Sequence, residues 1–384
     1  YTVAAKALYG DDHETVTEVK DGKARVLCDV AGGLGTGTYV DVYLRKNDKN
    51  ISYAQIPVDF VDNVSSELSF DIKDKSNYDD WNVTARVENN MNDTPISGYI
   101  EFSEPLELAK AGKTDIGTIG ANESKDITIN VPDLKEKGLR NFAYSVVTNE
   151  VTSVAFSKTY DLNIATRAKG KVVVDGTASS GEWPENTYMK ADSINNYVAL
   201  IGDEPWNGAD DKSAKVSVMW DDENLYMHSE VTDDVYFQNQ SAQNSWQCDG
   251  IQFGLLVDTG EEAFTAIGQA NTVFNEFAIA LLPDGKTVET YRHKAQFDRT
   301  PTGLCETAKG AAVRNGNKTY YEWSMPWEDI VGIKGWKPQV NQKLGFSIMW
   351  NDNDGNGRKG WIEYASGIGR VKDAKKFTQL QFVD

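Results

Sequence analysis

One tryptophan of this chain stands in a polar loop immediately before a run with the composition of a β-strand. Trp246 lies between Ser245 and Gly250, and the residues of 251–253 (Ile-Gln-Phe) begin the strand. An aromatic ring held ahead of a rigid strand can stack on a flat apolar face, and pyranose rings have such faces. The sequence therefore predicts a carbohydrate-binding surface, with hydrogen bonds to hydroxyl groups supplied by nearby polar side chains.

A second group of oxygen-bearing side chains has the spacing of a calcium loop. Asp352, Asp354 and Asn356 alternate before Gly357, and Glu363 follows, which fits the D-x-[DN]-x-[DN]-G-x5-E pattern. The flanking residues have strand composition, so the pattern does not predict an EF-hand. It predicts a calcium-stabilised hairpin loop, and the alternative is an Asn/Asp/Gly turn that holds no ion.

Catalytic and electron-transfer chemistry find little support in the sequence. His13, His228 and His293 are too scattered to suggest a triad, and no Gly-x-Ser-x-Gly elbow accompanies them. None of the 58 acidic residues stands in a motif typical of sugar-cleaving enzymes. Met227 and His228 are adjacent on a predicted strand, so they point to opposite faces and cannot ligate one haem iron. We expect no enzymatic activity.

Composition excludes several classes of partner. The net charge of −19 over 384 residues argues against nucleic acid and anionic membranes, which require a basic face. No apolar run approaches the ~20 residues needed to span a bilayer. Cys28, Cys248 and Cys305 are too few for a disulfide framework, and we expect buried thiols, with one disulfide as the alternative. The chain begins in mid-pattern, so we expect a piece of a longer extracellular protein, secreted or attached to the cell surface.

The elements that must position these residues are β-strands. Apolar residues alternate with polar ones through most of the chain, and turns rich in Gly, Asn, Asp and Pro interrupt them. Residues 216–220 and 225–231, joined by four polar residues, predict a β-hairpin. The predicted fold class is all-β, with two or three antiparallel β-sandwich modules in series. We place the modules at residues 1–78, 79–167 and 168–384.

The second of these segments resembles the immunoglobulin-like spacer modules of bacterial extracellular enzymes. The strand 82–89 ends in Val87-Glu-Asn89, and a Gly120-Ala-Asn-Glu-Ser124 turn follows. The resemblance implies an immunoglobulin-like β-sandwich over 79–167. Residues 1–78 are β-rich and could form a further module of this kind.

From Lys171 to the end, the chain resembles a carbohydrate-binding module of family 9. The order and spacing of several pieces carry this resemblance: Val174-Asp-Gly176, Glu182-Trp183, the hairpin of 216–231, the segment 321–327 (Tyr-Glu-Trp-Ser-Met-Pro-Trp), 345–352, and 376–382. The resemblance implies a β-sandwich without catalytic activity that is attached to a glycoside hydrolase. It also implies binding to a plant polysaccharide, xylan or a β-glucan such as cellulose, between two tryptophans, and structural Ca²⁺.

The site implied by the resemblance is only partly present. Trp246 falls at the position of the first tryptophan, whereas Gly369-Arg-Val371 stands where the second would be. Gln252 replaces a glutamate of the family, and Glu276 and Ala278 replace its glutamine and arginine. The end-of-chain specificity of the family is therefore not expected to carry over unchanged.

The predicted carbohydrate site consists of Trp246, Asp249, Gln252 and Glu276, with Trp206 as a replacement aromatic platform. The alternative function is that of a structural or adhesion spacer that has lost sugar binding. Five further tryptophans lie on predicted strands or at their entries and are expected in the core: Trp183, Trp220, Trp323, Trp327 and Trp350.

Overall fold

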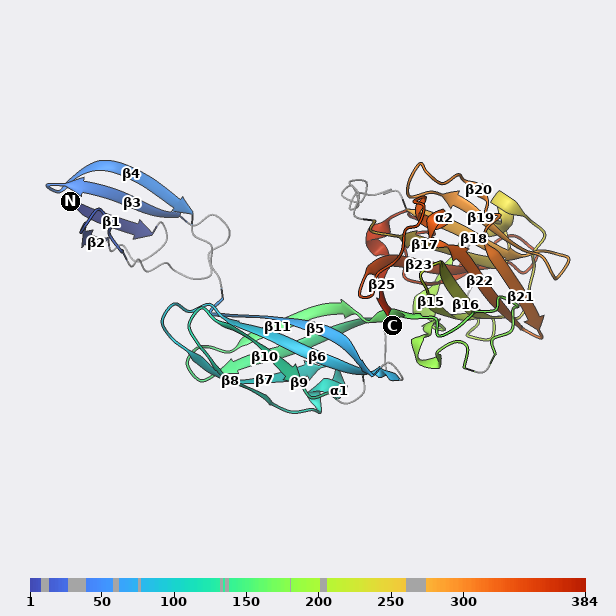
Figure 1. The fold of residues 1–384 in the computed structure, drawn as a ribbon, viewed down its shortest axis with the longest axis horizontal. Coiled ribbons are helices and arrows are strands. Elements are labelled where there is room, and N and C mark those ends of the chain that lie inside the picture. The colour runs from blue at the N-terminus through green and yellow to red at the C-terminus, as the bar shows by residue number, and fades with distance from the viewer. Residues whose placement is uncertain are drawn as a thin grey trace.

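The chain folds into three units that follow one another along the sequence (Figure 1). The computed structural model describes residues 1–7, 14–26, 39–57, 62–74, 77–131, 134, 138–179, 181–200, 206–259 and 274–384. Strands dominate all three units, and the sheets are almost entirely antiparallel. The predicted all-β fold class is confirmed.

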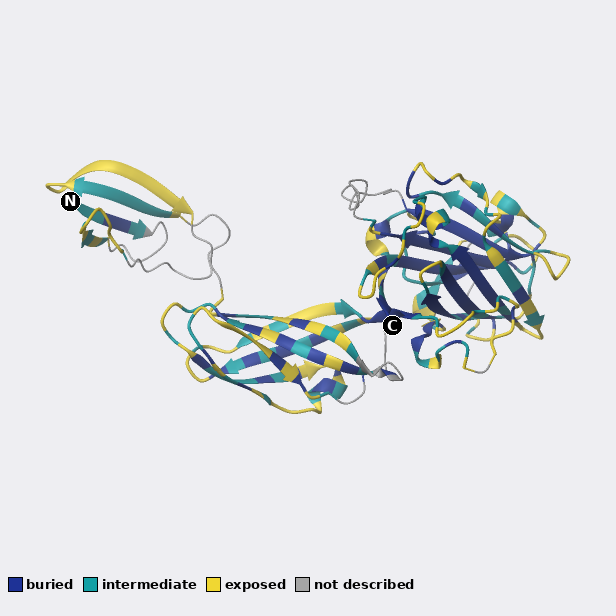
Figure 2. Cartoon of the chain, viewed as in Figure 1, coloured by how far each residue is buried: buried dark blue, intermediate teal, exposed yellow. Residues whose placement is uncertain are grey.

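The first unit is a single four-stranded sheet over its described residues. Its strands are β1 (Thr2–Ala7), β2 (Thr15–Glu18), β3 (Tyr39–Lys46) and β4 (Lys49–Pro57), in the order β2-β1-β3-β4. Every residue of β4 is exposed, as Figure 2 shows. The described part of this unit therefore does not show the second sheet that a sandwich would need.

The middle unit is a β-sandwich. Its strands are β5 (Val64–Asp74), β6 (Asn77–Asn89), β7 (Ile96–Glu104), β8 (Thr114–Ile119), β9 (Ser124–Ile129), β10 (Leu139–Thr148) and β11 (Val154–Asp161). They form the sheets β11-β10-β7-β8 and β5-β6-β9, which enclose one apolar core. The predicted division after residue 78 would separate β5 from β6, although the two pair along their length. The structure thus places β5 in the middle unit and the first boundary before Val64.

A buried asparagine joins the two motif pieces of this sandwich. Asn89 is 1 % exposed, and its Nδ2 donates to the backbone oxygens of Thr94, Ile119 and Gly120 at 2.9, 3.2 and 3.0 Å. One side chain thereby provides a donor to three backbone carbonyls where the chain turns. This explains why the Val87-Glu-Asn89 strand end accompanies the turn that starts at Gly120.

The third unit is a larger sandwich made from one sheet that folds back on itself. Its strands are β12 (Asn163–Arg167), β13 (Met189–Ala191), β14 (Tyr197–Ala199), β15 (Lys212–Trp220), β16 (Asn224–Asp233), β17 (Gly250–Leu256), β18 (Asn275–Leu281), β19 (Val288–Lys294), β20 (Gly303–Leu304), β21 (Lys309–Asn315), β22 (Lys318–Pro326), β23 (Lys343–Asp352), β24 (Gly360–Tyr364) and β25 (Thr378–Val383). The main path runs β20-β19-β18-β17-β23-β25-β12-β15-β16-β22-β21. Side chains from both halves of this path form a single core.

The predicted hairpin is β15–β16, and its turn is fixed by one aspartate. Asp221 Oδ1 accepts hydrogen bonds from the backbone N–H groups of Glu223 and Asn224 at 2.8 and 2.7 Å. Such a turn brings the two apolar runs into antiparallel register. All five tryptophans that were predicted in the core are buried: Trp183, Trp220, Trp323, Trp327 and Trp350.

The middle and third units share the segment that joins them. β12 pairs in parallel with both β25 and β15, so it closes the path of the third sandwich. Leu162 and Ile164 nevertheless pack into the core of the middle unit, together with Val383. The predicted boundary after residue 167 would assign β12 to the middle unit, whereas its strand pairing places it in the third.

Helices are few and short. The described residues contain two short α-helices, α1 (Leu106–Ala109) and α2 (Trp327–Val331), and several 3-10 turns, among them η3 (Ala242–Gln247). No helix in the described part of the chain has the length and apolarity to cross a membrane. Cys248 is buried and Cys305 half-buried, and both are free thiols, whereas Cys28 lies outside the described residues.

Candidate functional site

Trp246 lies at a groove in the surface of the third unit. Its half-buried side chain belongs to η3, which leads directly into β17. The groove has a volume of about 590 Å³ and is lined by Trp246, Gln252, Glu276, His293, Lys294, Met349, Arg358, Ile368, Gly369 and Lys372. We call it the Trp246 groove. The indole also borders an adjoining hollow of about 500 Å³, so it forms a wall between two depressions.

The polar floor of the Trp246 groove is held by a chain of hydrogen bonds. Gln252 on β17 and Glu276 on β18 are 4 % and 3 % exposed. Gln252 Nε2 donates to Glu276 Oε1 at 3.2 Å, and Asn351 Nδ2 donates to Gln252 Oε1 at 3.2 Å. Lys372 Nζ reaches the same Glu276 oxygen at 2.5 Å. The structure thus brings three predicted site residues, Trp246, Gln252 and Glu276, to one groove with fixed side chains.

Four basic side chains line the groove, and the sequence analysis selected none of them. They are His293 and Lys294 at the end of β19, Arg358 in the turn before β24, and Lys372. Burial lowers the pKa of the His293 imidazole, an effect that Lys372 reinforces and Glu276 opposes. Arg358 lies within the segment 352–363 that fits the calcium pattern, and that pattern specifies no basic position.

Arg358 lies between two indole rings. Its guanidinium carbon is 5.2 Å from the centroid of Trp246 and 4.7 Å from that of the buried Trp361. Its Nη2 donates to Oδ1 of Asn351. Burial lowers the pKa of this guanidinium to about 10, so it remains charged at neutral pH. A cation between aromatic faces is a stable arrangement that fixes the direction of the guanidinium plane.

The segment where a second tryptophan was expected carries no ring into the groove. Gly369 lines the groove, and an added Cβ there would lie 2.4 Å from Cζ2 of Trp361. Arg370 is exposed and donates to the backbone oxygen of Ala199, and Val371 is also exposed. Buried Trp361 therefore occupies the space that a side chain at position 369 would need.

Asp249 does not contact the groove, which corrects one predicted site residue. It is 1 % exposed, and its carboxylate accepts from Lys212 Nζ at 3.0 Å, from the Phe237 amide at 2.5 Å and from the Asn353 amide at 3.2 Å. All of these partners lie inside the protein. Asp249 therefore has a structural role beneath the loop that carries Trp246, and a ligand hydroxyl cannot reach it.

Trp206 does not act as a second platform in the Trp246 groove. Its half-buried indole donates from Nε1 to the backbone oxygen of Lys212 at 2.8 Å. It is not among the residues that line either of the hollows beside Trp246. Trp206 thus lies outside the Trp246 groove as the described residues define it.

The fold does not bring all residues of the calcium pattern together. β23 ends at Asp352, which pairs with Gly360 at the start of β24, so Glu363 lies opposite Met349. Glu363 Oε2 instead accepts from Nε1 of Trp361 at 2.7 Å. Asn356 is exposed in the turn. Glu363 therefore cannot close a shell around an ion held by Asp352, and this part of the predicted ligand set is wrong.

Asp233, which lies outside the calcium pattern, is close to Asp352 and Asp354. Carboxylate oxygens of Asp233, at the end of β16, and of Asp352 and Asp354 lie within 4.8 Å of one another. Both oxygens of Asp352 and Oδ1 of Asp354 are buried and have no hydrogen-bond partner among the described residues. Such unsatisfied oxygens are the donors that a hard divalent cation prefers. The residues present thus fit Ca²⁺, with Asp233 in place of Glu363.

Two buried lysines complete this acidic cluster. Lys212 Nζ lies 2.5 Å from Asp233 and 3.0 Å from Asp249, and Lys359 Nζ lies 2.8 Å from Asp211, 3.6 Å from Asp352 and 3.4 Å from Asp354. We define the acidic cluster as these five aspartates and two lysines. Burial raises the pKa of Asp352 to about 6, and Lys212 and Lys359 oppose that rise. Carboxylates outnumber ammonium groups in the cluster, which leaves room for a further positive charge.

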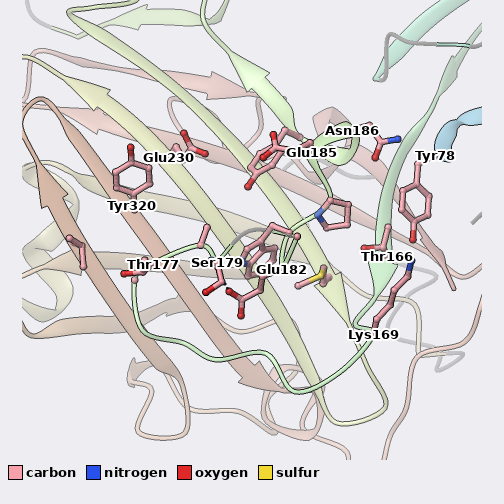
Figure 3. A pocket seen from close by; sticks show the side chains of 18 of the residues that line it. Tyr78, Thr166, Lys169, Thr177, Ser179, Glu182, Glu185, Asn186, Glu230 and Tyr320 are labelled. Atoms are coloured by element: carbon pink, nitrogen blue, oxygen red, sulfur yellow. Dashed lines mark hydrogen bonds between the residues drawn. The ribbon is translucent and has the colours of Figure 1, made fainter. Parts of the chain in front are cut away.

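A larger cleft of about 820 Å³ lies where the middle unit meets the third (Figure 3). In Figure 3, Tyr78 and Thr166 lie on one side of the cleft, Thr177 and Tyr320 lie on the other, and Glu182 lies between them. The indole of Trp183 is buried here and donates to Glu322 at 3.0 Å. The Glu182 carboxylate accepts from the amides of Val173 and Ser179. Trp183 and Glu182 are thus engaged by the protein itself, and the half-buried Tyr320 also lines the cleft.

Comparisons with known proteins found similar chains. A relative described as Exoglucanase XynX of Acetivibrio thermocellus is 26% identical over 197 residues, which cover 51% of this chain and 15% of that protein. The chain thus matches only a small part of that relative. Two solved structures of a carbohydrate binding module family 9 from Caldicellulosiruptor kristjanssonii are similar, one in complex with glucose and one with cellotriose. They have 16% and 17% identity and TM-scores of 0.39 and 0.39, and they cover 57% and 58% of this chain and 95% and 93% of those chains. The family model described as carbohydrate family 9 binding domain-like matches residues 174–384, more than half of the sequence, and the chain therefore belongs to that family.

Proposed function

We propose that the third unit binds a plant cell-wall glycan, xylan or a β-glucan, in the Trp246 groove. The observation that carries this proposal is the partly open indole of Trp246 beside a polar floor formed by Gln252 and Glu276. A pyranose ring would stack on the indole, and its hydroxyl groups would exchange hydrogen bonds with that floor. By analogy with bases on protein aromatics, one stacked ring contributes on the order of 1–3 kcal/mol.

The proposed role is binding without bond cleavage. The family to which the chain belongs is one of carbohydrate-binding domains, and such domains serve as non-catalytic modules. We infer that the chain forms part of a larger secreted or cell-surface protein with a glycoside hydrolase domain, because cell-wall polysaccharides are outside the cell. Locating the full-length protein in the medium or on the cell surface tests the inferred location, and recovery only from the cytoplasm would contradict it.

Affinity electrophoresis of the chain in gels that contain xylan, β-glucan or no polysaccharide tests the binding. We expect retardation by at least one polysaccharide and a loss of roughly ten- to hundredfold in affinity for Trp246→Ala, since the stacking energy is removed. Trp206→Ala is the matched control, because it removes a half-buried indole outside the groove. If Trp206→Ala alone abolished retardation, Trp246 would not be the platform. If no polysaccharide retarded the folded chain, the spacer function would be favoured instead.

We also propose that the acidic cluster holds a structural Ca²⁺. Asp233, Asp352 and Asp354 would supply carboxylate oxygens, and the ion would satisfy the buried oxygens that lack hydrogen bonds. Its contribution would be to the stability of the turn between β23 and β24, and no step of sugar binding requires contact with the ion. Thermal unfolding with calcium and with chelator tests this proposal.

A further inference from the structure

The Trp246 groove is basic although the protein is strongly acidic. The chain has 39 Lys and Arg against 58 Asp and Glu. The groove instead presents Arg358, Lys294, Lys372 and His293 with one carboxylate, that of Glu276. A stretch of positive potential in a negatively charged surface attracts anions and orients them.

Of the three charged side chains Arg358, Lys294 and Lys372, only Lys372 is paired with a carboxylate of the groove. Lys372 Nζ lies 2.5 Å from Glu276 and also donates to the backbone oxygen of Ile368 at 2.5 Å. The pair between Lys372 and Glu276 therefore leaves no full negative charge at the floor. A neutral Gln252 stands beside it, where the family resemblance leads us to expect a glutamate.

Arg358 and Lys294 have no carboxylate partner among the described residues. Arg358 contacts two indoles and the neutral amide oxygen of Asn351, and its Nε is buried without an acceptor. Lys294 Nζ lies 4.9 Å from the ring centroid of Phe274. Nε2 of His293, beside Lys294, is likewise buried without a partner. Partly buried charge that the protein does not pair is costly, unless a ligand supplies the opposite charge.

The planar guanidinium of Arg358 is suited to a carboxylate. Arginine binds carboxylates through parallel N–H donors, and its contacts with aromatic faces hold the donor fork in a fixed plane. A sugar stacked on Trp246 would place its substituents beside this fork, because the Arg358 guanidinium lies 5.2 Å from the Trp246 ring centroid. A neutral glucose or xylose unit offers only uncharged hydroxyl acceptors, which bind a guanidinium less strongly than a carboxylate does.

We propose that the Trp246 groove selects glycans that carry a uronic acid, with the carboxylate bound by Arg358 and Lys294. This inference rests on the proposed glycan-binding function and specifies its substrate class. Among cell-wall polysaccharides, it favours a xylan with glucuronic acid branches, or a polyuronate, over an unsubstituted β-glucan.

Isothermal titration of the full chain with matched oligosaccharides tests the proposal. The probes are trigalacturonate and a glucuronate-branched xylotriose, with unbranched xylotriose and cellotriose as neutral counterparts. We expect the uronate ligands to bind about tenfold more tightly at low ionic strength. The preference should shrink at high ionic strength, since salt screens exposed charges.

Variants assign the effect to the groove. Arg358→Gln should lower uronate affinity about tenfold and lower the affinity for neutral ligands less, so that the ratio of uronate to neutral affinity falls. Lys294→Gln should act in the same direction and provides the test if Arg358→Gln does not fold. Lys286→Gln is the matched control, because this exposed lysine lies in the turn at the other end of the β18–β19 hairpin.

Each outcome separates the two proposals. Equal binding of uronate and neutral ligands would overturn the charge selection and leave glycan binding intact. Binding of uronates that is unchanged in both groove variants would also overturn it. Failure of every oligosaccharide and polysaccharide to bind the folded chain would overturn the proposed function itself.

Discussion

The Trp246 groove and the acidic cluster use adjacent residues of the same turn for opposite purposes. Arg358 is half-buried and lines the groove, where it contacts two aromatic rings. Lys359, the next residue, is 7 % exposed and lies among Asp211, Asp352 and Asp354. In the groove, cations outnumber the one carboxylate. In the cluster, carboxylates outnumber the cations.

The difference distinguishes a charge used for stability from a charge available to a ligand. Lys359 Nζ lies 2.8–3.6 Å from carboxylate oxygens, so ion pairs within the protein neutralise its charge. Arg358 is oriented by neutral groups, so its charge remains available. Arg358 and Lys359 thus serve two regions from adjacent positions just before β24.

The largest effect should come from breaking the acidic cluster. Lys212→Met would leave Asp233 and Asp249 buried without their ammonium partner, and loss of one member of a buried pair costs about 3–5 kcal/mol. Chemical denaturation of the full chain measures the free energy of unfolding. Lys343→Met, at an exposed position on β23, is the control and should change it by less than about 0.5 kcal/mol. If Arg358→Gln lowered the free energy of unfolding as much as Lys212→Met, the charge of Arg358 would also be needed for stability, and the proposed difference between the groove and the cluster would be wrong.

Calcium should stabilise the cluster without acting on the groove. At a calcium concentration a hundredfold above the dissociation constant, a single site adds about 2.7 kcal/mol to the free energy of unfolding. We expect a higher melting temperature with calcium than with chelator, and no such difference in Asp352→Asn. Glu363→Gln should retain the response, since Glu363 bonds to Trp361 outside the cluster. Loss of the response in Glu363→Gln would favour the ligand set suggested by the sequence pattern.

The smallest effect should be the pH dependence of uronate binding. Burial lowers the pKa of His293 below its ordinary value, so the imidazole is neutral at pH 7 and becomes charged on acidification. A bound carboxylate favours the charged form, so affinity for trigalacturonate should rise a few-fold as the pH falls from 7 to 5. Glu276 favours this protonation, while Lys372, Lys294 and Arg358 oppose it. His293→Gln should flatten the profile, and an equal rise for cellotriose would contradict the assignment.

The sequence predicted features that depend on local pattern. The β15–β16 hairpin follows from two apolar runs around Asp221, and the core tryptophans follow from their strand positions. Trp246 could be placed at a surface because a polar loop surrounds it. Gln252 and Glu276 were located through the family resemblance, and the pairing of β17 with β18 brings them together.

Residues whose roles depend on distant partners could not be assigned in this way. Asp249 is polar and near Trp246, yet its orientation is set by Lys212 on β15. Asp233 was missed because the calcium pattern considers one continuous loop, whereas the end of β16 supplies the additional carboxylate. Glu363 was included because the pattern counts residues, although strand pairing after Gly360 carries it away from Asp352.

The shared strand β12 has a practical consequence for dividing this protein. A fragment cut at residue 168 would lack the strand that bridges β25 and β15, and two unpaired edges would be open to other chains. Such edges promote aggregation. A fragment that contains only the third unit should therefore start upstream of Asn163. The same strand carries Ile164 into the core of the middle unit, so a fragment that starts upstream of Asn163 removes a buried side chain from that core.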